Sequence, residues 1–348
     1  MKKDVNLPVS VIVPEFNAKE EDIKDLLVSL LASDYPVNLF EIIIVDDGSE
    51  KNHILEIIQT VPNNRRIRIQ FVRSKRNLGP SSARNLGAHF SKGDVLAFSD
   101  SDCVVERNWI RNIVNIFSRF PEAAAVSGPP RSWPRNSTVG KCENQLRKMS
   151  FGELKDGFKK SWGAARGGNF AIRRDVFFLL NGFDESLRTK EDHELAQRIL
   201  DSGNKIYFSN KVIIYHKNRQ SLRDICKQTF HNAVGDGIVF LSHPNIVSKQ
   251  YLSLFAFLIS LIISSVFIAS LNVTVTMVML LIPLLLYFPF IWLYYPFIKR
   301  QHLKNLRFKE KIVLSILSMI KNSVWCFGFL VGITKRILRK KKAIKHAK

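Results

Sequence analysis

Short apolar runs alternate with helical patterns along the first part of the chain. The runs that predict buried strands, because they are short and rich in β-branched or aromatic residues, are residues 9–13, 41–45, 67–72 and 95–98. The segments between them that place apolar side chains at helical spacing are residues 20–31, 54–58 and 80–91. This strict alternation predicts an α/β fold with a mostly parallel, doubly wound sheet.

Polar side chains follow three of the four predicted strands. The first strand is followed by Glu15 and Asn17, the second by Asp46 and Asp47, and the fourth by Asp100 and Asp102. Ligands of doubly wound sheets bind at the carboxyl ends of the strands, so this convergence predicts a binding site there. Taken alone, Asp46 and Asp47 are more typical of a turn or a helix cap.

The Asp100-Ser101-Asp102 segment is the most specific of these signals. It ends an apolar strand, so both carboxylates are expected to project from one strand end. Two carboxylates in that position repel each other unless a cation lies between them, and hard divalent ions prefer oxygen ligands. The chain has neither the glycine-lysine loop of ATP-binding proteins nor the GxGxxG of dinucleotide-binding ones.

Residues 251–298 are 48 consecutive residues without a charged side chain. A membrane-spanning helix needs about 20 apolar residues, so this segment predicts a two-helix transmembrane hairpin. The α/β domain then comprises residues 1–220, and residues 221–250 predict an amphipathic linker along the membrane surface. Residues 299–348 form a basic segment in which 312–334 predict one more helix, either lying in the interface or crossing the membrane.

The net charge is strongly positive and unevenly distributed. The chain has 52 Lys and Arg against 30 Asp and Glu, a net charge of +22. Residues 251–348 contain fifteen basic residues against a single acid, Glu310. Because this charge flanks the apolar segment, it predicts contact with anionic lipid head groups and argues against nucleic-acid binding.

Cysteine usage and the start of the chain bear on localisation. The chain has four cysteines, Cys103, Cys142, Cys226 and Cys326. They form neither a CxxC pair nor a spacing typical of metal ligands. Residues 1–16 lack the pattern of a cleaved signal peptide. Together with the hairpin, these features predict a multi-pass membrane protein whose α/β domain is cytosolic, in a microbial plasma membrane.

Six motifs in order give the chain a resemblance to a known enzyme family. They are VSVIVPEFN, EIIIVDDGS, NLGPSSARNLGA, VLAFSDSD, ARGGNFAIRRDVFFLLNGFDES and EDHELAQRI. Their order and spacing over residues 7–220 resemble the family 2 glycosyltransferases of GT-A fold. The resemblance implies an inverting enzyme that moves a sugar from a nucleotide diphosphate to an acceptor hydroxyl.

The resemblance also implies which residues bind the donor. The matching positions are Pro14, Glu15, Asn17, Asp47, Arg84, Asp100 and Gly168. Asp47 would accept hydrogen bonds from the base, which favours uracil, and Asp100 would contact the ribose or a metal-bound water. Glu15 departs from the usual pattern at its position.

By the same resemblance, Asp102 is expected to hold Mn²⁺ or Mg²⁺ against the diphosphate. His216, after the apolar residues 212–215, is either a second metal ligand or an ordinary hydrogen-bonded residue. Asp192 is implied as the general base, with Glu191 and Asn169 contacting the acceptor. Unaided by the resemblance, acids in the first turn of a helix are commonly explained by the helix dipole alone.

The QxxRW signature of processive polysaccharide synthases does not follow this helix, which favours the addition of a single sugar. The membrane segment favours a lipid-linked or glycan acceptor at the cytosolic face, which offers either a hydroxyl or a lipid phosphate, in polysaccharide or glycolipid biosynthesis. Two alternatives stay open: a soluble glycan or protein acceptor, and a non-catalytic scaffold within a polysaccharide assembly machine.

Overall fold

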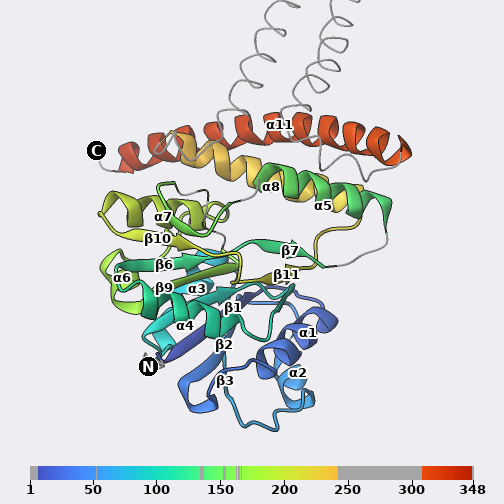
Figure 1. Cartoon of the computed structure of the whole chain (residues 1–348). Helices are drawn as coiled ribbons and strands as arrows, with labels where there is room; N and C mark the ends of the chain where they lie inside the picture. Colours follow the sequence, from blue (N-terminus) through green and yellow to red (C-terminus); the bar gives the residue numbers. More distant parts are fainter. Residues whose placement is uncertain are drawn as a thin grey trace, which may run out of the picture. The chain divides into compact units, whose positions relative to one another are not determined.

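The chain forms two compact units. The computed structural model describes residues 7–51, 53–133, 137–151, 154–161, 163, 165, 167–241 and 308–346. Met1–Pro134 and Glu153–Asn218 form one unit, here the α/β unit, and Arg135–Gly152 and Arg219–Lys348 form the other, here the helical unit (Figure 1). The sequence predicted one uninterrupted domain over residues 1–220, whereas the α/β unit omits residues 135–152.

An eight-stranded sheet in the order β3-β2-β1-β4-β9-β6-β10-β8 forms the centre of the α/β unit. Its strands are β1 (Val9–Glu15), β2 (Phe40–Asp46), β3 (Arg68–Arg73), β4 (Val95–Ser99), β6 (Ala123–Ser127), β8 (Gly157–Lys159), β9 (Asn169–Arg173) and β10 (Lys205–Phe208). The first four are parallel neighbours, as the sequence predicts. In the other half β6 and β10 are also parallel, whereas β9 runs antiparallel to both β4 and β6 and β8 runs antiparallel to β10, so the sheet is mixed although most of its strands run in one direction.

Helices cover both faces of this sheet. They are α1 (Glu20–Leu31), α2 (Ile54–Thr60), α3 (Pro80–Phe90), α4 (Trp109–Arg119), α6 (Arg174–Leu179) and α7 (Glu191–Asp201), with a short 3₁₀ turn, η1 (Val37–Leu39). Alternate residues of a strand point to opposite faces. Val11 and Val13 accordingly belong to a core with α1, α2 and α4, whereas Ile12 belongs to a second core with α3, α6 and α7. The domain is therefore doubly wound, as predicted.

A second, three-stranded sheet lies at the end of β4. It consists of β5 (Cys103–Val105), β11 (Ile214–His216) and β7 (Pro130–Ser132), with β11 in the middle. β5 and β11 are antiparallel, and their register places His216 directly opposite Cys103. The chain after Asp102 is thereby brought against the segment that ends the α/β unit.

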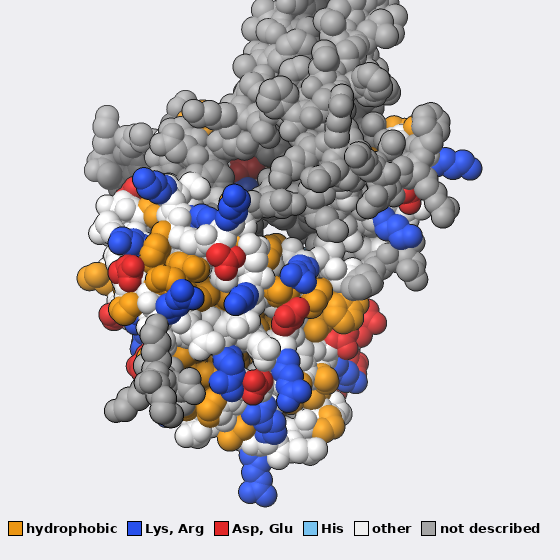
Figure 2. Space-filling model, viewed as in Figure 1, with side chains coloured by type: hydrophobic (Ala, Val, Ile, Leu, Met, Phe, Trp, Pro, Cys, Tyr) orange, Lys and Arg blue, Asp and Glu red, His pale blue; other side chains and the backbone are white. Residues whose placement is uncertain are grey.

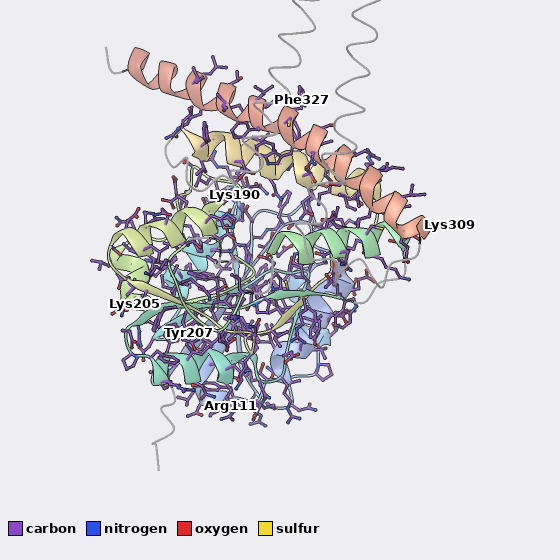
Figure 3. The ribbon with its side chains drawn as sticks, turned by 45° about the horizontal axis from the view of Figure 1, so that its top comes forward. Arg111, Lys190, Lys205, Tyr207, Lys309 and Phe327 are labelled. Atoms are coloured by element: carbon purple, nitrogen blue, oxygen red, sulfur yellow. The ribbon has the colours of Figure 1, made fainter. Side chains whose placement is uncertain are left out.

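The helical unit is built from α5 (Thr138–Phe151), α8 (Leu222–Phe240) and α11 (Phe308–His346). α11 lies along α8 and also contacts α5, as Figures 1 and 3 show. Two small apolar clusters join the helices, one around Trp325 and Phe329 and one around Ile225 and Leu314. The backbones approach closely at Gly237, where a Cβ would lie 2.2 Å from the carbonyl oxygen of Phe329.

The contacts of α11 include buried polar groups. Lys321 Nζ lies 2.6 Å from a carboxylate oxygen of Glu143, and Trp325 Nε1 donates to Asp236 at 2.8 Å. In the described part of the chain, Ile312–Leu338 is the one stretch of helix long and apolar enough to cross a membrane. The predicted hairpin at residues 251–298 lies outside the described residues.

The α11 helix also has an exposed apolar side. Six large hydrophobic residues along it are more than a third exposed, and they are Ile312, Ile316, Phe327, Leu330, Ile337 and Leu338. Lys309 and Phe327 mark the start and the middle of the helix in Figure 3. Successive positions are four, eleven, three, seven and one residues apart. At about 3.6 residues per turn all six fall on one side of the helix, so they form one stripe, here the α11 stripe.

Candidate active site

The ends of β1 and β2 are tied together by a buried polar network. Ser49 donates to Glu15 Oε1 at 2.9 Å, and its own backbone N–H donates to Asp46 Oδ1 at 2.7 Å. The hydroxyl of Ser49 also accepts from the backbone N–H of Asn17 at 2.8 Å. Burial, with a contribution from Asp46, raises the pKa of Glu15 to about 7. Glu15, which departs from the family pattern, is only 3% exposed. Its carboxyl therefore supports the loops that follow β1 and β2 from inside the unit.

Asp47 holds the loop that leads into α3. Its two carboxylate oxygens accept hydrogen bonds from the backbone N–H groups of Leu78 (2.9 Å) and Gly79 (2.7 Å). Gly79 has a φ of +104°, which side chains with a Cβ rarely adopt. Burial raises the pKa of Asp47 despite these hydrogen bonds. Each oxygen has a second lone pair, so this carboxylate can still accept a hydrogen bond from a ligand.

Arg84 of α3 joins the end of β4 to the start of α7. Its guanidinium donates to Asp100 Oδ1 at 2.7 Å and to Glu191 Oε1 at 2.6 Å, and its side chain is 5% exposed. Burial opposes the charged form of Arg84, but Asp100 and Glu191 outweigh it and raise the pKa of this residue. Burial likewise raises the pKa of Glu191, with Arg84 acting against it. One cation therefore fixes two carboxylates that lie 91 residues apart in the sequence.

Gly167 and Gly168 lie against two of the site carboxylates. A Cβ on Gly168 would lie 2.4 Å from Asp100 Oδ2, so any larger residue here would have to displace that carboxylate. The backbone N–H of Gly167 donates to Asp192 Oδ2 at 2.8 Å, which orients that carboxylate. Asp192 follows Lys190 and Glu191 at the start of α7, where Lys190 (labelled in Figure 3) has a left-handed φ of +68°. Such a backbone conformation costs about 1–3 kcal/mol and is concentrated at functional sites.

Asp100 also belongs to a second group of side chains. Asp100, Asp102, Cys103 and His216 each offer one ligand atom, and these atoms all lie within 4.8 Å of one another. His216 Nε2 is 3.3 Å from Asp102 Oδ1. Carboxylate oxygens and an imidazole nitrogen are ordinary ligands for Mn²⁺, and carboxylates suit Mg²⁺, so the donor set fits a divalent cation.

Asn169 has a place that the sequence did not predict. Its side chain is 0% exposed, accepts from Trp109 Nε1 at 2.8 Å and donates to the carbonyl of Val212 at 2.9 Å. The amide thus links β9 to α4 and to the segment before β11. These contacts give the side chain a role in the fold, and its contact with the acceptor stays a prediction.

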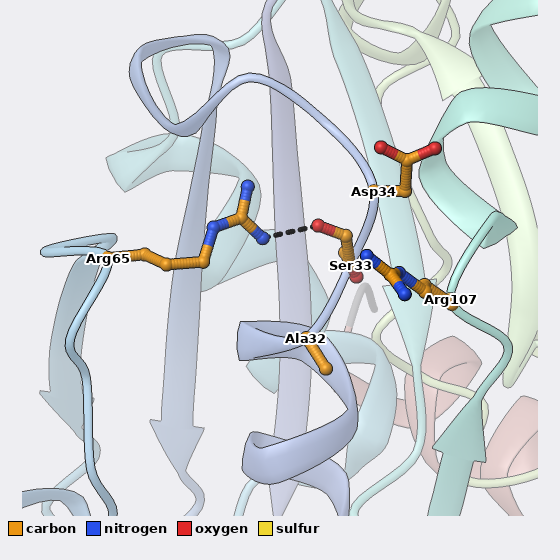
Figure 4. A pocket seen from close by; sticks show the side chains of 5 residues that line it. All are labelled: Ala32, Ser33, Asp34, Arg65 and Arg107. Carbon is orange, nitrogen blue, oxygen red and sulfur yellow. Dashed lines mark hydrogen bonds between the residues drawn. The ribbon is translucent and has the colours of Figure 1, made fainter.

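A separate cavity of about 460 Å³ opens beside the end of α1, lined by Ala32, Ser33, Asp34, Arg65 and Arg107 (Figure 4). Arg65 donates to the carbonyl oxygens of Leu31, Ser33 and Tyr35, so it caps the carboxyl end of α1. The loop after α1 leads into β2, which places this cavity toward the amino ends of the parallel strands. Basic side chains elsewhere on the face seen in Figure 2 are interspersed with acidic and hydrophobic ones.

The structure thus brings most of the predicted site residues together at the carboxyl ends of β1, β2 and β4. Asp100 is the shared member, since it contacts Arg84 and Gly168 on one side and the group of Asp102 and His216 on the other. Sequence reasoning missed Cys103. The signal that could have found it is its position directly after Asp102, at the start of a strand.

The fold and this acidic site define a GT-A type glycosyltransferase. A sequence model described as Glycosyl transferase family 2 matches residues 10–178, and one described as Glycosyl transferase family group 2 matches residues 96–298, which is more than half of the chain. The chain belongs to the family 2 glycosyltransferases.

Curated relatives carry glycosyltransferase names. Glycosyltransferase AglE of Haloferax volcanii is 27% identical over 231 residues, which cover 66% of this chain and 72% of that protein. The glucosyl-dolichyl phosphate glucuronosyltransferase of the same organism is 26% identical over 233 residues, covering 61% of this chain and 69% of that protein.

A solved structure extends the likeness along most of the chain. The mannosyltransferase PcManGT from Pyrobaculum calidifontis, in complex with GDP-Man and Mn²⁺, matches with a TM-score of 0.62 at 14% identity. The match covers 95% of this chain and 88% of that one. At this identity the likeness shows the fold.

Proposed function

We propose that this chain is an inverting, metal-dependent glycosyltransferase that transfers one sugar from a nucleotide-diphosphate sugar to an acceptor hydroxyl. The observation that carries the proposal is the shared position of Asp100. It lies in a group suited to a divalent cation and, through Arg84, in contact with the helix that presents Asp192. A donor site and a base are therefore held by one network.

On the donor side, Asp100, Asp102 and His216 would hold Mn²⁺ or Mg²⁺. Such an ion, when bound, neutralises the charge that develops on the departing nucleoside diphosphate. Pro14, Asn17 and Asp47 lie at the ends of β1 and β2 and would contact the nucleotide, with Glu15 supporting their loop. Uracil has one ring N–H donor suited to Asp47; thymine carries the same donor, and UDP is the nucleotide that we propose.

On the acceptor side, Asp192 would take the proton of the attacking hydroxyl. The hydroxyl oxygen attacks the anomeric carbon as the bond from that carbon to the diphosphate oxygen breaks on the opposite face, so the configuration inverts. The hydrogen bond from Gly167 orients Asp192, and Glu191 lies beside it as the proposed acceptor contact. A single displacement needs one base, and the second carboxylate of a retaining mechanism has no part in it.

The proposed acceptor is a sugar hydroxyl on a lipid-linked carrier or glycan at the cytosolic membrane face. One relative is named for transfer to glucosyl-dolichyl phosphate, whose sugar supplies hydroxyl groups. A hydroxyl needs a base when it attacks, whereas a phosphate acceptor is already ionised. The presence of Asp192 next to the donor site therefore favours a hydroxyl over a bare lipid phosphate.

Membrane attachment is part of the proposal. The α11 stripe would insert into the head-group region, and the basic residues after Thr334 would contact anionic lipids. An in-plane position is supported by the opposite side of α11, which packs along α8 and contacts polar groups such as Glu143 and Asp236. A spanning α11 would have to bring those groups into hydrocarbon, which is costly.

The experiment is a transfer assay with the full-length chain reconstituted in vesicles. Radiolabelled UDP-, GDP- and dTDP-sugars are offered with a microbial lipid extract, a soluble oligosaccharide or a protein. Label entering the lipid fraction, lost in Asp192→Asn and Asp102→Ala, is the expected result. Label only in a soluble acceptor would show that the anchor is merely a tether, and no transfer by any donor would favour the non-catalytic scaffold.

A further inference from the structure

Cys103 lies inside the metal-ligand group, although the proposed reaction gives it no role. It is a free thiol with 0% of its surface exposed, and it begins β5 directly after Asp102. A buried cysteine more often packs as a small hydrophobic residue, and Cys103 does contact one of the two apolar cores of the α/β unit. Its other neighbours include the side chain of Ser99, two carboxylates and an imidazole, and the last three are unusual beside a purely structural thiol.

Two backbone features explain why these side chains converge. The N–H of Cys103 donates to the carbonyl of Asp100 at 3.1 Å, which closes a tight turn over residues 100–103. The register of β5 and β11 then sets His216 opposite Cys103. Directly paired residues of antiparallel strands point to the same face of the sheet, with their Cβ atoms about 5 Å apart. The position of the thiol is thus fixed by a turn and a strand pair together.

The distances suit one common ion. Ligand atoms that lie about 2.0–2.5 Å from one metal ion cannot be more than about 5 Å from one another. The sulfur of Cys103, the imidazole of His216 and one oxygen each of Asp100 and Asp102 satisfy this limit, since all lie within 4.8 Å. None of the other three cysteines belongs to such a group within the part of the chain that the structure describes.

We propose that Cys103 is a ligand of the divalent cation, beside Asp100, Asp102 and His216, and that it makes the site select thiophilic ions over Mg²⁺. The inference rests on the metal site of the proposed function. On binding, the S–H bond breaks heterolytically, the proton leaves to solvent, and the thiolate forms a bond to the ion, with no change in oxidation state. Binding of the ion supplies the free energy of this deprotonation.

The chemistry of the donor set gives the expected order of ions. Carboxylates and water suit Mg²⁺ and Mn²⁺, imidazole suits Zn²⁺ and other late transition metals, and thiolate favours soft ions. A site with one thiolate and one imidazole should therefore bind Co²⁺, Zn²⁺ and Cd²⁺ more tightly than Mg²⁺. A site formed by the two carboxylates alone would not show that preference to the same degree.

The test is a Cd²⁺ titration of the folded full-length protein without nucleotide, followed by the ultraviolet thiolate-to-metal charge-transfer band. We expect the band to saturate near one equivalent, to disappear in Cys103→Ser and to persist in Cys226→Ser, which removes a partly exposed thiol elsewhere. Failure of the wild type to show the band, or an undiminished band in Cys103→Ser, would overturn the inference.

A selectivity measurement separates ligation from a structural role. Removing one ligand should weaken Cd²⁺ binding by more than about tenfold while changing Mg²⁺ binding by less than about threefold. Equal weakening of both ions in Cys103→Ser, and in Cys103→Ala as a second variant of confirmed fold, would show that the thiol only supports the fold. Asp102→Asn should weaken both ions. If the wild type binds Mn²⁺ but shows no thiolate band in the Cd²⁺ titration, the proposed function stands and this inference fails.

Discussion

Buried ion pairs occur in both units of the molecule, but the pair in the helical unit is balanced and the group in the α/β unit is not. In the helical unit, Lys321 pairs with Glu143, whose side chain is 3% exposed, so one cation meets one anion. In the α/β unit, Arg84 pairs with both Asp100 and Glu191, and Asp102 lies in the adjoining group.

The difference separates a structural contact from a binding site. A balanced pair neutralises its own charge and fixes two helices together, whereas carboxylates in excess of their cation are stabilised by any additional cation. Exposure matters as well. Lys217 also contacts two acids, Asp22 and Asp25, but the side chain of Asp25 is 53% exposed, so water already solvates the extra charge.

The largest expected effect comes from removing one acid of the unbalanced site. Asp192→Asn should reduce kcat by about 10²–10⁴-fold, because the amide cannot accept the proton of the acceptor hydroxyl. Nucleotide affinity should change little, as measured by titration on the same preparation. Asp201→Asn, an exposed acid at the far end of the same helix, is the matched control and should retain normal turnover. Normal turnover in Asp192→Asn would remove this residue from the mechanism.

Replacing the cation of each buried ion pair compares the two units by their effect on stability. Arg84→Met and Lys321→Met should each lower the free energy of unfolding by about 3–5 kcal/mol, because a buried carboxylate loses its partner. Urea denaturation followed by circular dichroism measures this loss.

The double replacements should then diverge. Lys321→Met with Glu143→Leu should recover most of the stability, since neither charge of the pair remains. Arg84→Met with Glu191→Leu should recover less, because Asp100 still lacks its cation. Equal recovery in the two units would contradict the distinction between balanced and unbalanced charges.

The next effect depends on pH and concerns Glu15. Its pKa is raised from 4.5 to about 7, so the folded protein holds this proton more tightly than the unfolded chain does. The stability gained from that proton is complete below the unfolded pKa and is lost as the pH rises from 4.5 to about 7. The loss is on the order of 3 kcal/mol, and Glu15→Gln should abolish it. Urea midpoints of both proteins across this range are the measurement, and an equally steep dependence in Glu15→Gln would assign it to another group.

The smallest expected effect lies on the α11 stripe. Phe327, 64% exposed, should contribute about 1–2 kcal/mol to vesicle binding, so Phe327→Ser should weaken partitioning by roughly 5–30-fold. Ser323→Ala, at another exposed position of the same helix, is the control. Co-sedimentation with vesicles containing anionic lipid measures the difference. Unchanged partitioning of Phe327→Ser would remove this stripe as a membrane contact.

Local patterns were sufficient for the parallel half of the fold. The predicted helix at residues 20–31 matches α1 because its apolar positions recur at helical spacing, and the four predicted strands are β1 to β4 within two residues. The mixed half was not predicted, because strands such as β8 are three residues long and are defined by distant partners. The membership of α5 in the helical unit likewise depends on contacts with α11, which no local pattern encodes.

The site shows the same limit. Strand ends placed Asp100 and Asp102 together, since both follow β4. The partnership of Arg84 with Glu191 spans 107 residues and requires the fold to bring α3 and α7 together. The resemblance implied that Asn169 contacts the acceptor, but no local pattern predicted that its amide also bonds to Trp109 and Val212 inside the unit. Cys103 was passed over because cysteine spacing was judged against other cysteines and not against Asp102 and His216.

The most direct test of the central claim is calorimetric titration of the full-length protein with UDP, GDP and dTDP, each with and without Mn²⁺. We predict that one nucleotide, with UDP favoured, binds only when Mn²⁺ is present, and that Asp102→Ala abolishes this metal dependence. Binding of no nucleotide by the folded protein, or binding unaffected by both the metal and the substitution, would contradict the assignment of the acidic group as the donor site.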